Sequence, residues 1–191
     1  MHRYVCVLLI GLTMAACLPA NAQRTRGDVE LFGMKLKGAT RDQLRAAFQA
    51  GGLQPERIDN DYWIDLYKAN GVLDEASSFK AGFAHANNTF AFAQYRFDAF
   101  MDIGLVTRVA KLVSSKYGKA DSQSGHSGLG PVTYKWRLPQ GMLIEVSRGW
   151  PDTTTYMTFI DPINKARMDA EMAQAQARRE QVRAKAQSQA F

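Results

Sequence analysis

The strongest constraint on the fold is a pattern that occurs twice along the chain, an amphipathic helix followed by three strands. In the first pass, Thr40 can cap a helix that Gly51 and Gly52 end, because glycine readily adopts the positive φ found after a helix. Alternation of apolar and polar residues then predicts three strands, within residues 62–67, 79–84 and 90–93.

The second pass begins with a longer helix over residues 105–117, which Gly118 ends. Asp98 or Asp102 can cap its start. A loop is expected from Gly125 to Pro131. Three strands are predicted after the loop, at residues 132–138, 142–147 and 153–160. This order is typical of an α+β fold with helices packed on an antiparallel sheet, and the shared pattern indicates a duplicated unit.

A third helix is predicted after Asp161, which can cap it, with Pro162 in its first turn. The residues that follow are mostly Ala, Gln, Arg and Glu, which are good helix formers. Large apolar residues are too few to bury this helix along its length, so we expect it to dock at its start and then project. The sequence therefore divides into a signal peptide (1–22), an N-terminal segment (23–37), a single α+β domain (38–161) and a C-terminal helix or tail (162–191).

The first 22 residues have the pattern of a cleaved secretory signal peptide. An apolar run from Tyr4 to Ala16 follows a short basic start, and it is shorter than the roughly 20 residues that span a bilayer. Ala20-Asn21-Ala22 provides a small-x-small cleavage site. The alternative is acylation of Cys17, because Met14-Ala15-Ala16-Cys17 is similar to a lipobox. Both routes predict export to the periplasm, with the protein either free or attached to the envelope.

Composition excludes several kinds of site. Both cysteines, Cys6 and Cys17, lie in the targeting segment, so the mature domain has no disulfide and no thiolate chemistry. Residues 38–161 carry thirteen basic and thirteen acidic side chains, so the excess positive charge lies near the ends of the chain. The Gly/Ser loop around His126 matches neither a nucleophile elbow nor a phosphate loop. We therefore expect no catalytic residues, no metal and no cofactor.

Residues suited to contact with a partner fall into two groups. Trp150 and Arg148, in a predicted hairpin turn, are residue types favoured in binding hot spots, unless the indole folds back over the sheet edge. His126 lies on a loop long enough to enter a cleft. The second group suits an anionic membrane surface or an acidic envelope protein, and no recognition motif for nucleic acid accompanies it. It consists of Arg178, Arg179, Arg183 and Lys185.

Two segments resemble known envelope proteins. Gly38-Ala39-Thr40-Arg41-Asp42-Gln43-Leu44, with the strands at Tyr62-Trp63-Ile64 and Phe79 to Phe83, resembles the helix start and strands of the SmpA/OmlA-like small outer-membrane lipoproteins. In the second half, Lys116-Tyr117-Gly118-Lys119, Trp136 and Thr154 to Asp161 resemble a pattern common in uncharacterised bacterial periplasmic proteins. These resemblances imply a non-enzymatic role in the cell envelope.

We therefore predict a non-catalytic periplasmic or envelope-associated accessory protein that binds another macromolecule. One alternative is an inhibitor or immunity protein, whose loop from Gly125 to Gly130 enters the active site of a cell-wall hydrolase or toxin. Another is an enzyme whose site assembles from distant residues. An exposed apolar groove would favour the accessory protein, a protruding ordered loop the inhibitor, and a polar cleft with perturbed carboxylates the enzyme.

Overall fold

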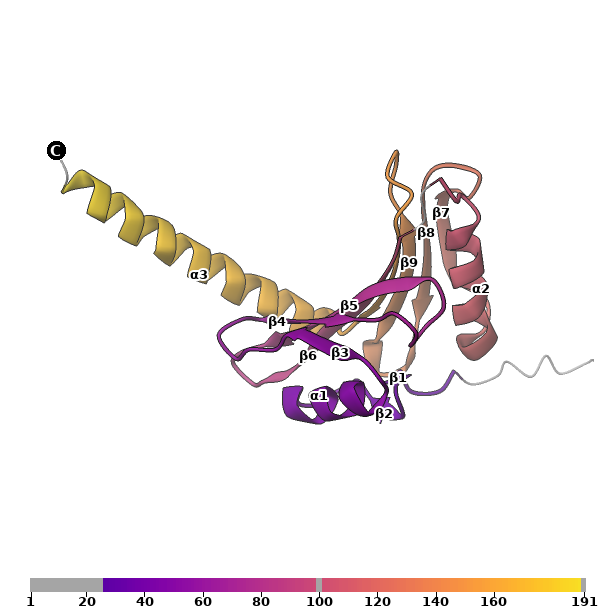
Figure 1. Cartoon of the computed structure of the whole chain (residues 1–191), viewed down its shortest axis with the longest axis horizontal. Coiled ribbons are helices and arrows are strands. Elements are labelled where there is room, and N and C mark those ends of the chain that lie inside the picture. The colour runs from indigo at the N-terminus through magenta and orange to yellow at the C-terminus, as the bar shows by residue number, and fades with distance from the viewer. Residues whose placement is uncertain (1–25, 99–100, 190–191) are drawn as a thin grey trace, which may run out of the picture.

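Eight antiparallel strands form one sheet in the computed structural model, which describes residues 26–98 and 101–189 (Figure 1). The strand order across the sheet is β3-β4-β5-β6-β10-β9-β8-β7. These strands are β3 (Gln54–Arg57), β4 (Ile64–Lys68), β5 (Ala76–Ala84), β6 (Thr89–Phe97), β7 (Ser122–His126), β8 (Leu129–Arg137), β9 (Leu143–Arg148) and β10 (Thr155–Ile160). The other described elements are the hairpin β1 (Glu30–Leu31) and β2 (Met34–Lys35), the helices α1 (Arg41–Ala50), α2 (Leu105–Tyr117) and α3 (Pro162–Ser188), and a short 3₁₀ turn, η1 (Pro139–Gly141).

The two passes of the sequence pattern form two repeats, each a helix followed by four strands. Helix α1 precedes β3 to β6, and α2 precedes β7 to β10. The repeats join at the centre of the sheet, where β6 pairs with β10 from Phe97↔Thr155 to Phe92↔Ile160. From this centre to either edge of the sheet, the strands of each repeat follow one another in the reverse of their order along the chain. The predicted α+β fold is confirmed, with four strands per repeat in place of three.

The strand that was not expected is the outermost one in each repeat. All residues of β3 and β7 are exposed, so neither shows the alternation of apolar and polar residues that marks a half-buried strand. Short polar edge strands of this kind limit pairing with other chains. The loop predicted from Gly125 to Pro131 is corrected by this finding, because Gly125 pairs with Val132 in a β7–β8 hairpin.

The helix ends follow from local residues. Thr40 and Gln43 form a reciprocal capping box at the start of α1, as the sequence predicts. Helix α2 has no side-chain N-cap; instead the amide of Gly104, which precedes it, donates to the Asp102 carboxylate at 2.9 Å. Gly118, with φ of 80°, ends α2, because its positive φ turns the chain out of the helix.

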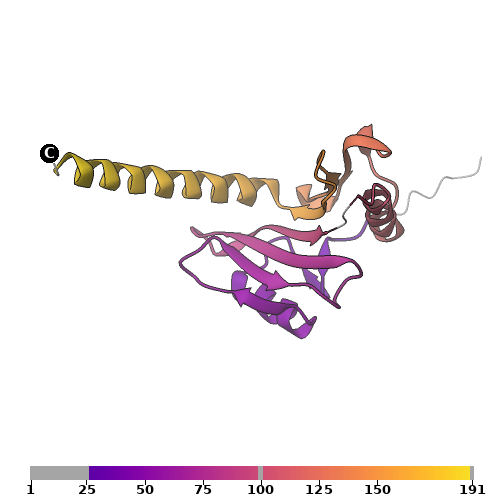
Figure 2. The ribbon, with the colours of Figure 1, turned by 45° about the horizontal axis from the view of Figure 1, so that its top comes forward.

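The main core lies between one face of the sheet and helices α1 and α2 (Figure 2). Aromatic rings fill the first repeat: the centroid of Phe79 lies 4.9 Å from that of Phe48 and 4.6 Å from that of Tyr95. In the second repeat Trp136 is fully buried, and its indole N–H donates to the carbonyl of Gly118 at 2.8 Å. This buried apolar core stabilises residues 38–161, which contain no cysteine.

Helix α3 begins on the opposite face of the sheet. Asp161 caps it by accepting hydrogen bonds from the amides of Ile163 and Asn164. Met168 is buried in a small second core with side chains of β5 and β6. One turn later, Glu171 accepts hydrogen bonds from the amides of His85 and Ala86 and from the indole of Trp63. These contacts fix the start of the helix on the first repeat.

The rest of α3 extends away from the sheet (Figures 1 and 2). All its residues from Gln176 to Ser188 are exposed. The expected helix that docks at its start and then projects is therefore observed. Within residues 26–98 and 101–189, no helix is both long and apolar enough to cross a membrane.

Candidate binding surfaces

Three loops meet at one end of the second repeat, and the buried side chain of Arg148 connects two of them to its own strand. Its Nη1 donates to the carbonyl oxygens of Ile103, at 2.7 Å, and Ser127, at 3.0 Å. Its Nη2 donates to that of Gly130 at 2.6 Å. Because the guanidinium is planar with donors in fixed directions, it sets the β6–α2 connection and the β7–β8 hairpin relative to β9.

The prediction that Arg148 contacts a partner is therefore corrected. The side chain is only 2 % exposed, and both terminal nitrogens are used within the protein. Its role is to position the loops that surround it. No sequence pattern indicated this role, because a lone arginine in a predicted hairpin turn is usually solvated.

Four large apolar side chains on these loops are exposed, and together they form what we term the loop tip: Met101, Ile103, Leu129 and Trp150. Met101 is 75 % exposed, Leu129 69 % and Trp150 51 %. Exposed apolar groups gathered on neighbouring loops are typical of interaction surfaces. In Figure 1 the β7–β8 and β9–β10 turns stand out beyond the sheet, at the end where α2 begins. Trp150 thus stays half-exposed and is not folded away into the core.

Short-range hydrogen bonds fix the turns that carry the loop tip. In the β9–β10 turn, Asp152 accepts hydrogen bonds from the hydroxyl of Thr154, at 2.6 Å, and from its amide, at 2.9 Å. These bonds lower the pKa of the Asp152 carboxyl. In the β7–β8 turn, the Gly128 amide donates to Nδ1 of His126 at 3.1 Å. His126 is exposed, as the partner-binding hypothesis requires, but one ring nitrogen is used within its own turn.

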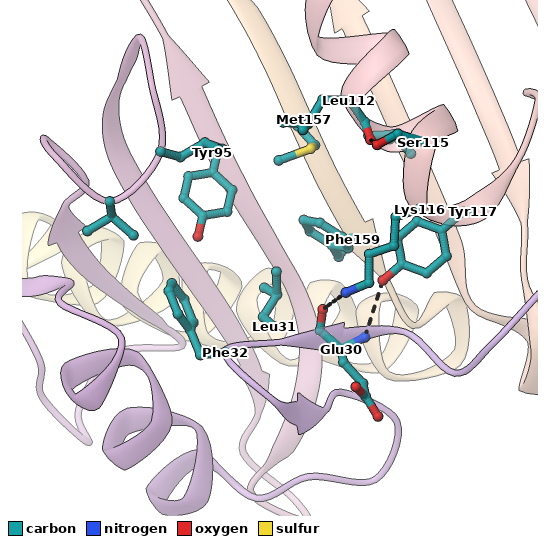
Figure 3. Close-up of a pocket in the computed structure, with 13 residues that line it drawn as sticks. Glu30, Leu31, Phe32, Tyr95, Leu112, Ser115, Lys116, Tyr117, Met157 and Phe159 are labelled. Atoms are coloured by element: carbon teal, nitrogen blue, oxygen red, sulfur yellow. Dashed lines mark hydrogen bonds between the residues drawn. The ribbon is translucent and has the colours of Figure 1, made fainter.

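A groove lies on the helix-covered face of the sheet, between α2 and the β1–β2 hairpin (Figure 3). Its floor is made by β6 and β10, the two strands that join the repeats, and its volume is about 430 Å³. Apolar side chains dominate the walls and floor, among them Leu31, Phe32, Leu112, Val113, Met157 and Phe159. The sequence did not reveal this groove, because its lining comes from five separate parts of the chain.

Two polar groups face the groove from different sides (Figure 3). Tyr95 is 3 % exposed, and its hydroxyl makes no hydrogen bond to any described residue. Burial raises the pKa of this hydroxyl, which keeps it neutral. At the C-terminal end of α2, the Lys116 ammonium donates to the carbonyl of Glu30 at 3.3 Å. It forms no ion pair within the described part of the chain.

The exposed part of α3 carries the predicted basic residues. Arg178 and Val182 are four residues apart, and so are Arg179 and Arg183, so the pairs lie in adjacent rows on the helix. Lys185 continues the first row. Val182 is 70 % exposed, so it adds an apolar side chain to this basic surface. The structure brings these residues together along α3 but keeps them apart from the loop tip.

Asp65, in the acidic segment that also contains Asp59 and Asp61, forms a structural ion pair. Asp65 is fully buried, and its carboxylate accepts hydrogen bonds from Arg41, at 2.6 Å, and from Arg45, at 2.7 Å. Burial alone would raise the pKa of this carboxyl, but the hydrogen bonds from Arg45 and Arg41 lower it. Among the described residues, no group of three His, Cys, Asp or Glu is arranged to hold a metal ion.

No protein-family model matches the sequence, and no curated protein matches it either. Among solved structures, the crystal structure of a DUF4309 family protein (YjgB) from Bacillus subtilis is similar to this chain, with a TM-score of 0.44 and 16 % sequence identity. The match covers 70 % of this chain and 87 % of that one. A likeness of this degree carries no functional argument, so function is inferred from the geometry of this chain.

Proposed function

We propose that this protein is an exported, non-catalytic binding protein of the cell envelope, and that it inserts the loop tip into a concave apolar site on a partner protein. The observation that carries the proposal is the exposure of Met101, Leu129 and Trp150 on loops that a buried arginine holds in place. Convex turns with apolar ends suit a partner whose own surface is concave.

The fixed geometry of the loops favours binding. Ordering a mobile loop on association costs free energy, so loops that are already held by Arg148 and by the Asp152 turn reduce that cost. A tryptophan near the centre of an interface is among the residues that contribute most to binding. Trp150 therefore has both the residue type and the rigid support of a binding hot spot.

The environment of the buried Asp65 carboxylate does not suit a catalytic group. A catalytic acid or base needs a pKa near the working pH and access to substrate. Asp65 has neither property, because two arginines hold its pKa low and the side chain is completely buried. Its arrangement is that of an ion pair that stabilises the fold.

Export rests on the first 22 residues, which lie outside the described part of the chain. We expect mass spectrometry of the protein from its native host to find an N-terminus at Gln23. An acylated Cys17 would instead make the protein a lipoprotein and leave the binding proposal unchanged. An intact Met1 on protein recovered from the cytoplasm would contradict the envelope location.

The binding proposal is tested by capture of a partner from an envelope fraction of the native host. The loop-tip variant combines Leu129→Ser and Trp150→Ser. Its matched control combines Ile163→Ser and Val182→Ser, which remove apolar side chains that are 68 % and 70 % exposed elsewhere on the molecule. Because all four positions are exposed, each variant should unfold at nearly the temperature of the unmodified protein.

A partner retained by the unmodified protein and the control, but lost by the loop-tip variant, is the expected result. Equal capture by the loop-tip variant would overturn the proposal. So would equal loss in both variants, since that would indicate non-specific apolar adsorption.

A second candidate function, inhibition, is favoured by the protruding β7–β8 hairpin (Figure 1). If the captured partner is a hydrolase or toxin, a loop tip seated in its active site would block substrate. The captured partner should then lose activity when the unmodified protein is added and keep it when the loop-tip variant is added. If neither protein changes the activity of the captured partner, inhibition of that partner is excluded and the accessory role remains.

A further inference from the structure

The apolar groove in Figure 3 is separate from the loop tip. The loop tip lies at the end of the molecule where α2 begins. The groove instead includes Leu112, Lys116 and Tyr117, in the C-terminal half of that helix. A volume of about 430 Å³ lies within the range of roughly 300–1,000 Å³ that is usual for small-molecule sites. The groove therefore has room for a ligand that the proposed partner contact does not use.

The floor of the groove limits the kind of ligand that it can hold. An extended peptide binds a sheet mainly by main-chain hydrogen bonds to a free edge. Strands β6 and β10 pair with each other, and each pairs on its other side with β5 or β9. Because their backbone groups are already used, a ligand in the groove must be held by side chains, and the side chains there are mostly apolar.

The polar groups of the groove indicate a head group with negative charge. The Lys116 ammonium stands at one side without a carboxylate partner among the described residues. Figure 3 shows the Glu30 carboxylate pointing away from the groove, so it does not compensate this charge. The neutral hydroxyl of Tyr95 is a second hydrogen-bond donor, at the opposite side of the groove, and it favours a ligand that carries oxygen over a pure hydrocarbon.

We propose that the groove binds a free medium-chain fatty acid, with the carboxylate at Lys116 and the acyl chain over Met157 and Phe159. A single apolar chain matches the lining, and the carboxylate matches the unpaired ammonium. Leu112, which is half-exposed on α2, covers part of the chain at the rim. This site is independent of the partner contact at the loop tip, so either proposal can fail without the other.

The probe is dodecanoate, titrated into the mature protein below its micelle concentration and followed by calorimetry. We expect saturable binding of one molecule per chain. Decanoate should bind roughly tenfold more weakly, because each methylene removed from an apolar site forfeits part of the transfer free energy. Lys116→Gln should weaken dodecanoate binding roughly tenfold at low salt. It should leave binding of dodecanol, which has no charge, unchanged.

The matched control is Lys111→Gln, which removes the same charge from an exposed position on α2 that does not line the groove. Leu112→Glu places an anion at the rim on an exposed helix position and should abolish binding without unfolding the protein. The proposal is overturned if the unmodified protein shows no saturable binding of dodecanoate. It is also overturned if Lys111→Gln weakens binding as much as Lys116→Gln, or if Leu112→Glu binds normally.

Discussion

The two arginines that are buried in the described part of the chain, Arg41 and Arg148, have different partners. Arg41 shares the carboxylate of Asp65 with Arg45, so its charge is compensated. Arg148 has no carboxylate partner among the described residues, and backbone carbonyls alone accept its hydrogen bonds. A buried charge with only dipoles as partners is costly. Arg148 offsets this cost by holding the β6–α2 connection and the β7–β8 hairpin against its own strand, β9.

The Asp65 ion pair leads to a prediction about stability and pH. Asp65→Asn removes the negative charge and leaves Arg41 buried without compensation, so unfolding should become easier by about 3–5 kcal/mol. Chemical denaturation measures this loss at neutral pH. The control is Asp61→Asn, an exposed residue in the neighbouring turn, and it should change the free energy of unfolding by less than about 0.5 kcal/mol.

The pH dependence of the same pair follows from the direction of its pKa shift. The folded-state pKa of Asp65 is lower than the unfolded value of about 3.9. The stabilisation is therefore complete well above pH 4, and it is lost as the pH falls from the unfolded pKa through the folded one. The difference in stability between the unmodified protein and Asp65→Asn should shrink over that acid range. A difference that stays constant with pH would contradict this account.

At the scale of elements, the sequence predicts the helices and strands that have a buried apolar face. It does not predict the strands that form only through backbone pairing. The strong periodicity of α2 and β8 reflects residues such as Val109 and Trp136, which face the core. Strands β3 and β7 face no core, so their residues carry no pattern, and only the pairing with β4 and β8 makes them strands. The first turns of α3 were predictable from Asp161 and Pro162, because capping is local chemistry.

Helix α3 should contribute to the fold only at its start. Met168 and Glu171 make its contacts with the sheet, and beyond Met172 the helix is almost wholly exposed. Deleting residues 173–191 should therefore lower the free energy of unfolding by about 1 kcal/mol or less. Thermal unfolding followed by circular dichroism measures this. Loss of a cooperative transition after the deletion would show that the distal helix is part of the folding unit.

At the scale of the whole molecule, three surfaces lie in three different places. The loop tip and the groove are near opposite ends of α2, and the basic part of α3 extends away from the sheet (Figure 1). The tryptophan of the loop tip and the basic residues of α3 could be selected from the sequence, because each stands in a short exposed segment. The groove and the Arg148 contacts could not, since they join residues far apart in the chain that only the sheet topology brings together.

The basic surface of α3 is the part of the molecule best placed to reach a membrane while the domain remains free to bind its partner. Each basic residue near an anionic lipid surface contributes about 1 kcal/mol, and four of them give weak attachment that salt screens over about 8 Å at physiological ionic strength. We therefore propose that the mature protein binds vesicles containing anionic phospholipid at low salt and is released as the salt concentration approaches the physiological value. Cosedimentation with such vesicles measures this.

The decisive variant changes the four basic residues of the distal helix to glutamine: Arg178, Arg179, Arg183 and Lys185. It should lose vesicle binding while the domain stays folded, because all four side chains are exposed. The matched control removes the same number of charges from exposed positions of the domain: Lys68, Lys111, Lys119 and Lys135. If attachment depended only on net charge, both variants would be released from the vesicles equally. Attachment through α3 requires that only the α3 variant be released. Binding that persists in the α3 variant at low salt would rule out this helix as the attachment surface.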